Sequence, residues 1–258
     1  MLLWVESRDT PLIALLIFAF CYLLAICMFA IGALISRLAI AHHVSTTTPA
    51  MLTPLGVITG LVIAFLAAHV WTNVDHANAY VAEEASEIRQ TVLLTEVLPV
   101  DVASEVRGDI VRYLQFVDTD DWPSMLEGRA SLRKLPEGLP EALKALLTFV
   151  PEQPGQRVAQ EHAARAIERA LQARRDRIVL SQTAIAPAQW AVIFVLDGLI
   201  LLTIAMLHVG RHVTTVVNLF TFSTAIAACV VLLIINDRPF SAGGHTVPPA
   251  PLQAVHLR

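Results

Sequence analysis

Four long apolar runs constrain this chain more than any other feature of its sequence. A helix needs about 20 consecutive apolar residues to cross the hydrocarbon core of a bilayer. Runs of that length occupy about residues 11–35, 50–71, 188–207 and 213–235, while most charged residues lie between residues 75 and 180. We therefore predict an all-α integral membrane protein, with four transmembrane helices in two hairpins that flank a water-facing helical domain.

The same runs divide the chain into four predicted parts. An N-terminal transmembrane hairpin covers residues 1–74, a helical domain 75–186, a second hairpin 187–236 and a C-terminal tail 237–258. The first run is longer than the apolar core of a signal peptide and lacks its basic flank, so we expect it to be a retained span. The tail after Phe240 is rich in glycine and proline, which predicts an extended or loosely ordered segment.

Basic residues predict the orientation in the membrane. Four spans put both termini and the central domain on one side, and the two short links on the other. The links contain only Arg37 and Arg211, and all other lysines and arginines share the central side. Because basic loops remain in the cytoplasm, we expect a protein of the inner (plasma) membrane with cytoplasmic termini and a cytoplasmic central domain.

Composition and motifs argue against several functional classes. No catalytic motif or nucleotide-binding loop occurs, so we predict that the chain is not an enzyme and needs no cofactor. A net charge of −4 and the lack of a basic stripe argue against nucleic-acid binding. The three cysteines lie in apolar runs, and the paired histidines of the outer links (His42, His43, His208, His212) lack a third ligand, so no metal site is expected.

An acidic stretch from Asp118 to Asp121 precedes Trp122-Pro123. Its three carboxylates resemble part of a calcium loop, but the glycine and the distal glutamate of an EF-hand are missing. We interpret the stretch as a solvated turn or helix cap.

The second span carries two distinct faces. Small residues form a stripe suited to close helix packing, made of Gly56, Gly60 and Ala64. The opposite face carries larger side chains, namely Ile58, Val62, Phe65 and His69. In a single subunit these would contact lipid or other helices. In a ring of identical subunits they would line a hydrophobic constriction, which can gate by dewetting.

Two polar residues interrupt the last two spans. Asp197 lies near the middle of the third span and Asn218 lies in the fourth. An ionisable group in hydrocarbon is costly and usually faces the bundle interior or a wet cavity. Asp197 is therefore either a residue of a transport pathway or a structural group that hydrogen-bonds to Asn218 or Thr203.

A series of short motifs resembles a known family. It begins with Gly60-Leu-Val-Ile-Ala-Phe65 and Glu83-Glu84-Ala-x-x-Ile88, and it ends with Asp237-Arg238-Pro239-Phe240 just after the fourth span. Between them lie Arg112-Tyr113, Trp122-Pro123, Arg174-Arg175-x-Arg177, Pro187 and Trp190. In order and spacing relative to four spans, the chain resembles the bestrophin-like domain proteins of bacteria and plants.

The resemblance implies a fold and a function. Bestrophins proper are pentameric anion channels with four spans per subunit, a helical cytoplasmic domain and a pore lined by the second span. The resemblance therefore implies that this chain forms a homopentamer in the lipid bilayer. It also implies a permeant ion, which could be an anion. It also implies a pore lined by Ile58, Val62, Phe65, His69 and Asn73. This chain departs from true bestrophins after the second span, where Asn73-Val-Asp-His-Ala-Asn78 replaces a run rich in arginine and tryptophan.

Three functions remain open at this point. The first is a homo-oligomeric ion channel with the second span around its axis. The second is a non-conducting scaffold or sensor whose cytoplasmic helices bind a partner. The third is a small-solute transporter that uses Asp197.

Overall fold

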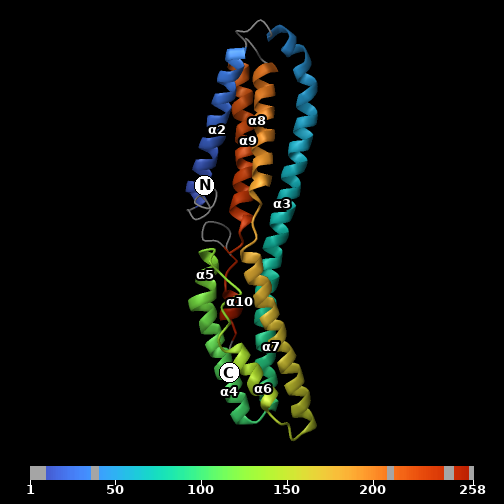
Figure 1. Cartoon of the computed structure of the whole chain (residues 1–258), viewed down its shortest axis with the longest axis vertical. Coiled ribbons are helices and arrows are strands. Elements are labelled where there is room, and N and C mark those ends of the chain that lie inside the picture. The colour runs from blue at the N-terminus through green and yellow to red at the C-terminus, as the bar shows by residue number, and fades with distance from the viewer. Residues whose placement is uncertain (1–9, 36–40, 208–211, 241–246, 256–258) are drawn as a thin grey trace. The chain divides into compact units, whose positions relative to one another are not determined.

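The computed structural model describes residues 10–35, 41–207, 212–240 and 247–255 (Figure 1). These residues form helices and no strand, which confirms the all-α prediction. The long helices are α2 (Thr10–Ile35), α3 (Ala41–Leu94), α4 (Val100–Phe116), α7 (Pro154–Ser181), α8 (Pro187–Leu207) and α9 (His212–Asp237). The shorter ones are η1 (Thr95–Val97), η2 (Val117–Asp121), α5 (Trp122–Leu126), α6 (Leu139–Thr148) and α10 (Ala250–Gln253).

Four of the described helices are long and apolar enough to cross a membrane. They are α2, the part of α3 that begins at Ala50, α8 and α9. Each corresponds to one of the four apolar runs of the sequence, so the predicted four-span architecture is confirmed. The backbone groups of a helix are satisfied within the helix, which is why such segments are tolerated in hydrocarbon.

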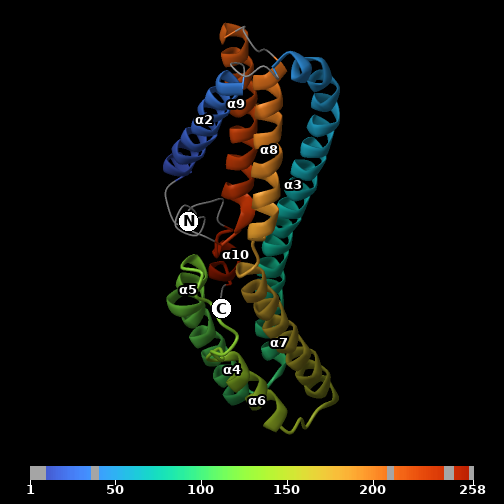
Figure 2. The same cartoon turned by 45° about the horizontal axis from the view of Figure 1, so that its top comes forward.

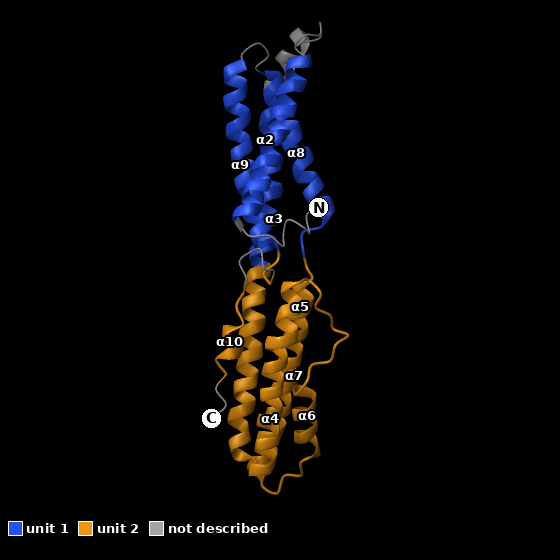
Figure 3. Cartoon of the chain, turned by 90° about the vertical axis from the view of Figure 1, so that its left-hand side faces the viewer, with its two compact units in different colours: residues 1–72, 184–237 blue, residues 73–183, 238–258 orange. Residues whose placement is uncertain are grey.

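The chain forms two compact units, which Figure 3 colours separately. The first unit holds residues 1–72 and 184–237. In it, α2 packs against both α8 and α9, and these two helices lie side by side (Figure 2). Ile13, Cys21 and Ile193 are fully buried in one apolar cluster of this bundle. Near the other end of α2, a Cβ added at Gly32 would lie 2.9 Å from the Cβ of Ala205, so glycine permits this close helix approach.

The second unit holds residues 73–183 and 238–258. Its core is built from the second half of α3 together with α4, α6 and α7, and includes Ile88, Ile110, Leu146 and Ile167. Gly138 precedes α6 with a φ of 90°. A side chain there would collide with α4, because an added Cβ would lie 2.1 Å from the carbonyl oxygen of Asp109. This glycine therefore sets how closely α6 approaches α4.

Helix α3 is the element that belongs to both units. It continues without a break for 54 residues. At 1.5 Å per residue it is about 80 Å long, far more than the roughly 30 Å of a hydrocarbon core. Its second half therefore extends as a water-facing helix, as the polar sequence after Thr72 requires.

Two sequence-based predictions for the second unit are wrong in part. The tail is not loosely ordered over residues 247–255, because Val247, Leu252 and Val255 are buried in the core and the Val247 N–H donates to the Pro239 carbonyl at 2.8 Å. The acidic stretch is not a turn either. It continues the helix through η2, and Asp121 is buried. In both cases the segments are held by distant parts of the chain.

Candidate functional site

The membrane half of α3 packs within its own bundle along one narrow side. Thr59, Leu66 and Val70 are buried there, and the Thr59 hydroxyl donates to the Leu55 carbonyl at 2.8 Å. The other side is open, with Val57 65% and Phe65 67% exposed. Only 11% of the residues in the most apolar stretch of α3 are buried, whereas 44% are buried in the corresponding stretch of α8. Most of this helix is therefore available to lipid or to another subunit.

The five residues proposed to line a pore do not all share the open side. Ile58, Phe65 and His69 are exposed. Val62 is half-buried against the apolar cluster of the first unit, and Asn73 is buried. The open side therefore carries three of the five. Leu61, which is 54% exposed, also belongs to the open side although the sequence reasoning did not select it.

The small residues of α3 also lie on its open side. Gly56, Gly60 and Ala64 are exposed. A Cβ added at either glycine would meet no heavy atom within 4 Å. The stripe is therefore not used for packing within the described part of the chain.

A buried ion pair joins α3 to α7 in the second unit. Arg177 donates to both carboxylate oxygens of Glu84, from Nε at 2.8 Å and from Nη2 at 3.0 Å. Both side chains are completely buried. The Tyr113 hydroxyl of α4 donates to the same carboxylate. Burial, and then the negative charge of Glu84, raises the pKa of Tyr113 well above its usual range. Glu84 also raises the pKa of Arg177, although burial acts in the opposite direction.

A second buried pair extends this network to η2. Arg174 donates to Asp121 from Nε at 2.7 Å and from Nη2 at 2.9 Å. Asp121 also lies 3.6 Å from Arg177, so the two pairs are connected. Arginines three positions apart share one helix face, whereas Arg175 points away and is exposed. The arginine motif therefore supplies two buried cations and one exposed cation. Sequence reasoning selected the arginines but missed Asp121 and Tyr113 as their partners.

Aromatic side chains enclose the network. The Arg177 guanidinium lies 5.2 Å from the centre of the Trp122 ring, a distance suited to a cation–π interaction. Phe240 packs edge-on against Trp122 with ring centres 5.8 Å apart. The motif that follows α9 thus reaches the buried charges through Phe240, a link that the order of the sequence motifs does not reveal.

The first residue of that motif, Asp237, acts in the first unit. Asp237, at the end of α9, accepts a hydrogen bond from the backbone N–H of Ile185 at 2.8 Å. Ile185 lies just before α8, so the carboxylate ties the end of one span to the beginning of another. Asp237 is buried, so this hydrogen bond is shielded from water.

Asp197 lies fully buried in the bundle of the first unit. Neither of its carboxylate oxygens has a hydrogen-bond partner among the described residues. Thr203 donates instead to the Leu199 carbonyl at 2.8 Å, and Asn218 is half-buried without reaching Asp197. The predicted structural bond from Asp197 to Thr203 or Asn218 is therefore not formed.

Two remaining features carry little chemistry. Within the described ranges, no group of three or more His, Cys, Asp or Glu side chains is placed to hold a metal ion. His208 and the side chains of His42 and His43 lie outside what the structure describes, and His212 is exposed.

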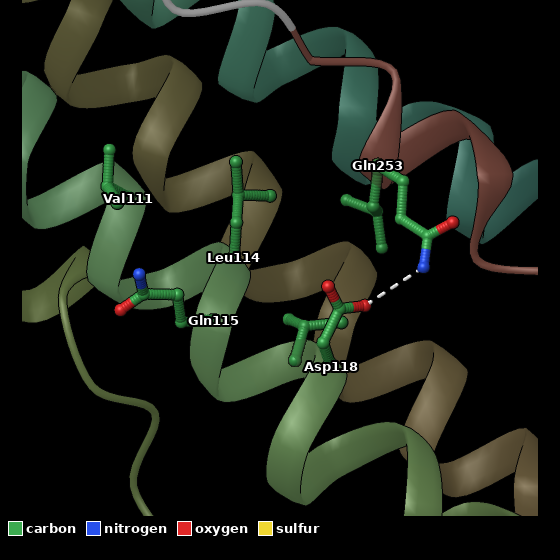
Figure 4. A pocket seen from close by; sticks show the side chains of 7 residues that line it. Val111, Leu114, Gln115, Asp118 and Gln253 are labelled. Atoms are coloured by element: carbon green, nitrogen blue, oxygen red, sulfur yellow. Dashed lines mark hydrogen bonds between the residues drawn. The ribbon is translucent and has the colours of Figure 1, made fainter.

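One surface pocket lies where α10 rests on α4 (Figure 4). Its volume is about 210 Å³, below the 300–1,000 Å³ typical of small-molecule sites. Gln253 donates to Asp118 across it at 3.2 Å. We interpret the pocket as part of the contact between the C-terminal tail and α4.

The fold and these features define a multi-pass, all-helical membrane protein, and comparison with known proteins specifies its family. The family model described as Bestrophin-like domain matches residues 18–252. The chain therefore belongs to the bestrophin-like family, whose fold is known from ion channels. No curated protein matches the chain.

Solved structures share the fold at low sequence identity. A mutant of a bacterial bestrophin homolog from Klebsiella pneumoniae is 15% identical, with a TM-score of 0.70 over 92% of this chain and 96% of that chain. Another structure of the Klebsiella pneumoniae homolog is 14% identical, with a TM-score of 0.62 over 92% of this chain and 95% of that chain. A variant described as a membrane protein is 14% identical, with a TM-score of 0.69 over the same shares.

Proposed function

We propose that this chain is the subunit of a homo-oligomeric ion channel, in which the open side of α3 surrounds the axis. The family and its fold favour a channel over an enzyme. The observation that carries the proposal is the open side itself, where α3 leaves Phe65 and its neighbours unpacked although α8 and α9 are well packed.

The two flanks of the open side suit two different surroundings. Small residues let a second backbone approach closely, and Gly56 and Gly60 find no neighbour within the chain. The flank with Ile58, Leu61 and Phe65 presents large apolar side chains instead. In a ring of copies, the small flank fits against the adjacent subunit and the large flank faces the axis. The number of copies is five if the assembly follows bestrophins proper.

A ring of Phe65 side chains forms an apolar constriction. Water leaves a sufficiently narrow apolar pore, and ions then cross only when the ring widens. Phe65 is the largest exposed side chain of this flank, so we assign the gate to it. Ile58, about two turns earlier, adds a second apolar layer.

The topology completes the proposal. We place both termini and the second unit in the cytoplasm of the inner membrane, following the distribution of basic residues. The water-facing half of α3 then continues the pathway on the cytoplasmic side. Cysteine accessibility to a membrane-impermeant reagent at exposed positions of α7, such as Arg175, tests this orientation.

The function is tested by flux through purified protein in liposomes. Phe65→Ala replaces the large side chain of the gate with a small one and widens the apolar constriction. We therefore expect it to raise ion flux several-fold over the unmodified chain. Leu23→Ala on α2 is the matched control, because Leu23 is similarly exposed (59%) but lies on another span. Native mass spectrometry of the same samples reports the number of subunits.

Two results would contradict the proposal. A monomer under mild conditions leaves no ring for α3 to line. Equal ion flux through Phe65→Ala, Leu23→Ala and the unmodified chain would show that Phe65 does not limit the passage of ions.

A further inference from the structure

The face of α3 that carries Phe65 continues into the water-facing half of the helix. Because α3 is unbroken, side chains that follow Phe65 at helical spacing stay on one side of it. Glu83 lies about five helical turns after Phe65 and points in nearly the same direction. Phe65 and Glu83 are both exposed. The positions between them on this face are exposed too, namely His69, Thr72, His76 and Ala79.

Three glutamates lie close together in this half of α3, and the structure gives them different roles. Glu84 is buried and paired with Arg177. Glu87 pairs with Arg169 at 2.9 Å. Glu83 is exposed and has neither an ion-pair nor a hydrogen-bond partner among the described residues. Its negative charge is therefore the one of the three that no nearby cation neutralises.

Positive charge is scarce on the same face. Arg89 is the only lysine or arginine of α3. It lies about 120° around the helix from Glu83. Its guanidinium donates to the Pro251 carbonyl of the tail at 3.3 Å, which holds it against the second unit. The remaining basic side chains of the face are those of His69 and His76.

We infer that Glu83 is a selectivity-determining residue, which makes the pathway prefer monovalent cations to chloride. The inference rests on the proposed channel. In a ring of copies with α3 around the axis, the Glu83 carboxylates converge into a ring of like charge. Rings of Asp or Glu side chains are one established basis of cation selectivity in channels. Such a ring raises the local concentration of cations and lowers that of anions.

The apolar layer and the carboxylate ring then have separate tasks. Phe65 carries no charge and limits the passage of every ion. Glu83 acts on the sign of the ion, within the Debye length of about 8 Å at physiological ionic strength. This predicts cations for this chain, in place of the anion that the resemblance to bestrophins proper suggested.

The test is a reversal-potential measurement on the full-length purified chain in planar bilayers, with a gradient of KCl at pH 8. We expect the potassium-to-chloride permeability ratio of the unmodified chain to exceed 1. Glu83→Gln removes one charge per subunit with almost no change in shape, and we expect the ratio to fall by about tenfold. Glu168→Gln is the control, because Glu168 is exposed on α7 and carries the same charge.

Each outcome separates the inference from the proposed function. Currents that favour chloride in the unmodified chain, or a ratio that Glu83→Gln leaves unchanged, overturn the role of Glu83 but leave the channel intact. An equal fall in Glu168→Gln also overturns it, since the effect would then be one of net charge. No current for either ion overturns the channel and the inference together, and the subunit count then shows whether assembly failed.

Discussion

Removal of the Glu84 carboxylate is the sharpest test of how the second unit is held together. Arg177 is completely buried and donates its two shortest hydrogen bonds to Glu84. Loss of one partner of a buried ion pair costs about 3–5 kcal/mol, because the other charge remains buried and uncompensated. Arg177 keeps Asp121 at 3.6 Å and the Trp122 ring. We therefore expect Glu84→Gln to lie at the lower end, at about 3 kcal/mol.

The neighbouring glutamate supplies a matched control. Glu87→Gln is the same substitution on the same helix, but its partner Arg169 is half-exposed at 50%. Ion pairs that water reaches contribute less than about 1 kcal/mol. The free energy of unfolding in mild detergent, followed by circular dichroism against denaturant, is expected to fall about three times more for Glu84→Gln than for Glu87→Gln.

A double substitution tests the electrostatic explanation. Arg177→Met leaves Glu84 buried with Tyr113 as its remaining donor, and is expected to cost at least as much as Glu84→Gln. The combination Glu84→Gln with Arg177→Met buries no charge from this pair. Its cost should therefore fall well below the sum of the two single costs. Additive costs, or a Glu84→Gln protein as stable as Glu87→Gln, would refute the reasoning.

Three further substitutions test the surroundings of this network. The pKa of Tyr113 is raised in the folded state, so its contribution is complete below about pH 10 and is lost as the pH rises above that value. The free energy of unfolding is expected to decrease between pH 9 and 11, and Tyr113→Phe should reduce that decrease; an identical slope would contradict the assignment. Gly138→Ala is expected to destabilise the second unit by about 3 kcal/mol or more, because its Cβ would overlap the Asp109 carbonyl. Gly128→Ala, with a φ of 67° and only the Arg238 guanidinium 3.8 Å away, should cost about 1 kcal/mol in the same denaturation assay.

The four spans were predictable because the membrane imposes a local requirement. A run of apolar residues long enough to cross the bilayer is visible without any knowledge of its neighbours. The helical character of the domain after residue 74 was also predicted from the sequence. These features depend on residues that lie close together in the sequence.

The buried charges depend on distant residues, and here the sequence was less informative. Asp121 looked like a solvated acidic residue because its partner Arg174 lies 53 positions away. The tail looked loosely ordered because its buried residues pack against helices that are far away in the chain. Helical periodicity also placed Val62 on the pore face. In the structure, α3 is oriented about its axis so that Val62 packs against the apolar cluster of its bundle and is half-buried. A pattern fixes a spacing along one helix, whereas packing decides which side faces inward.

The buried network therefore matters for the proposed pathway as well as for stability. Glu83 and Glu84 are adjacent, so their side chains point about 100° apart around α3. Two bonds from Arg177 and one from Tyr113 hold Glu84 inward, against α7 and α4. With Glu84 fixed, α3 cannot rotate about its axis in the second unit without breaking a fully buried ion pair. The same anchor thus keeps Glu83 on the exposed side of the helix, where a ring of carboxylates requires it.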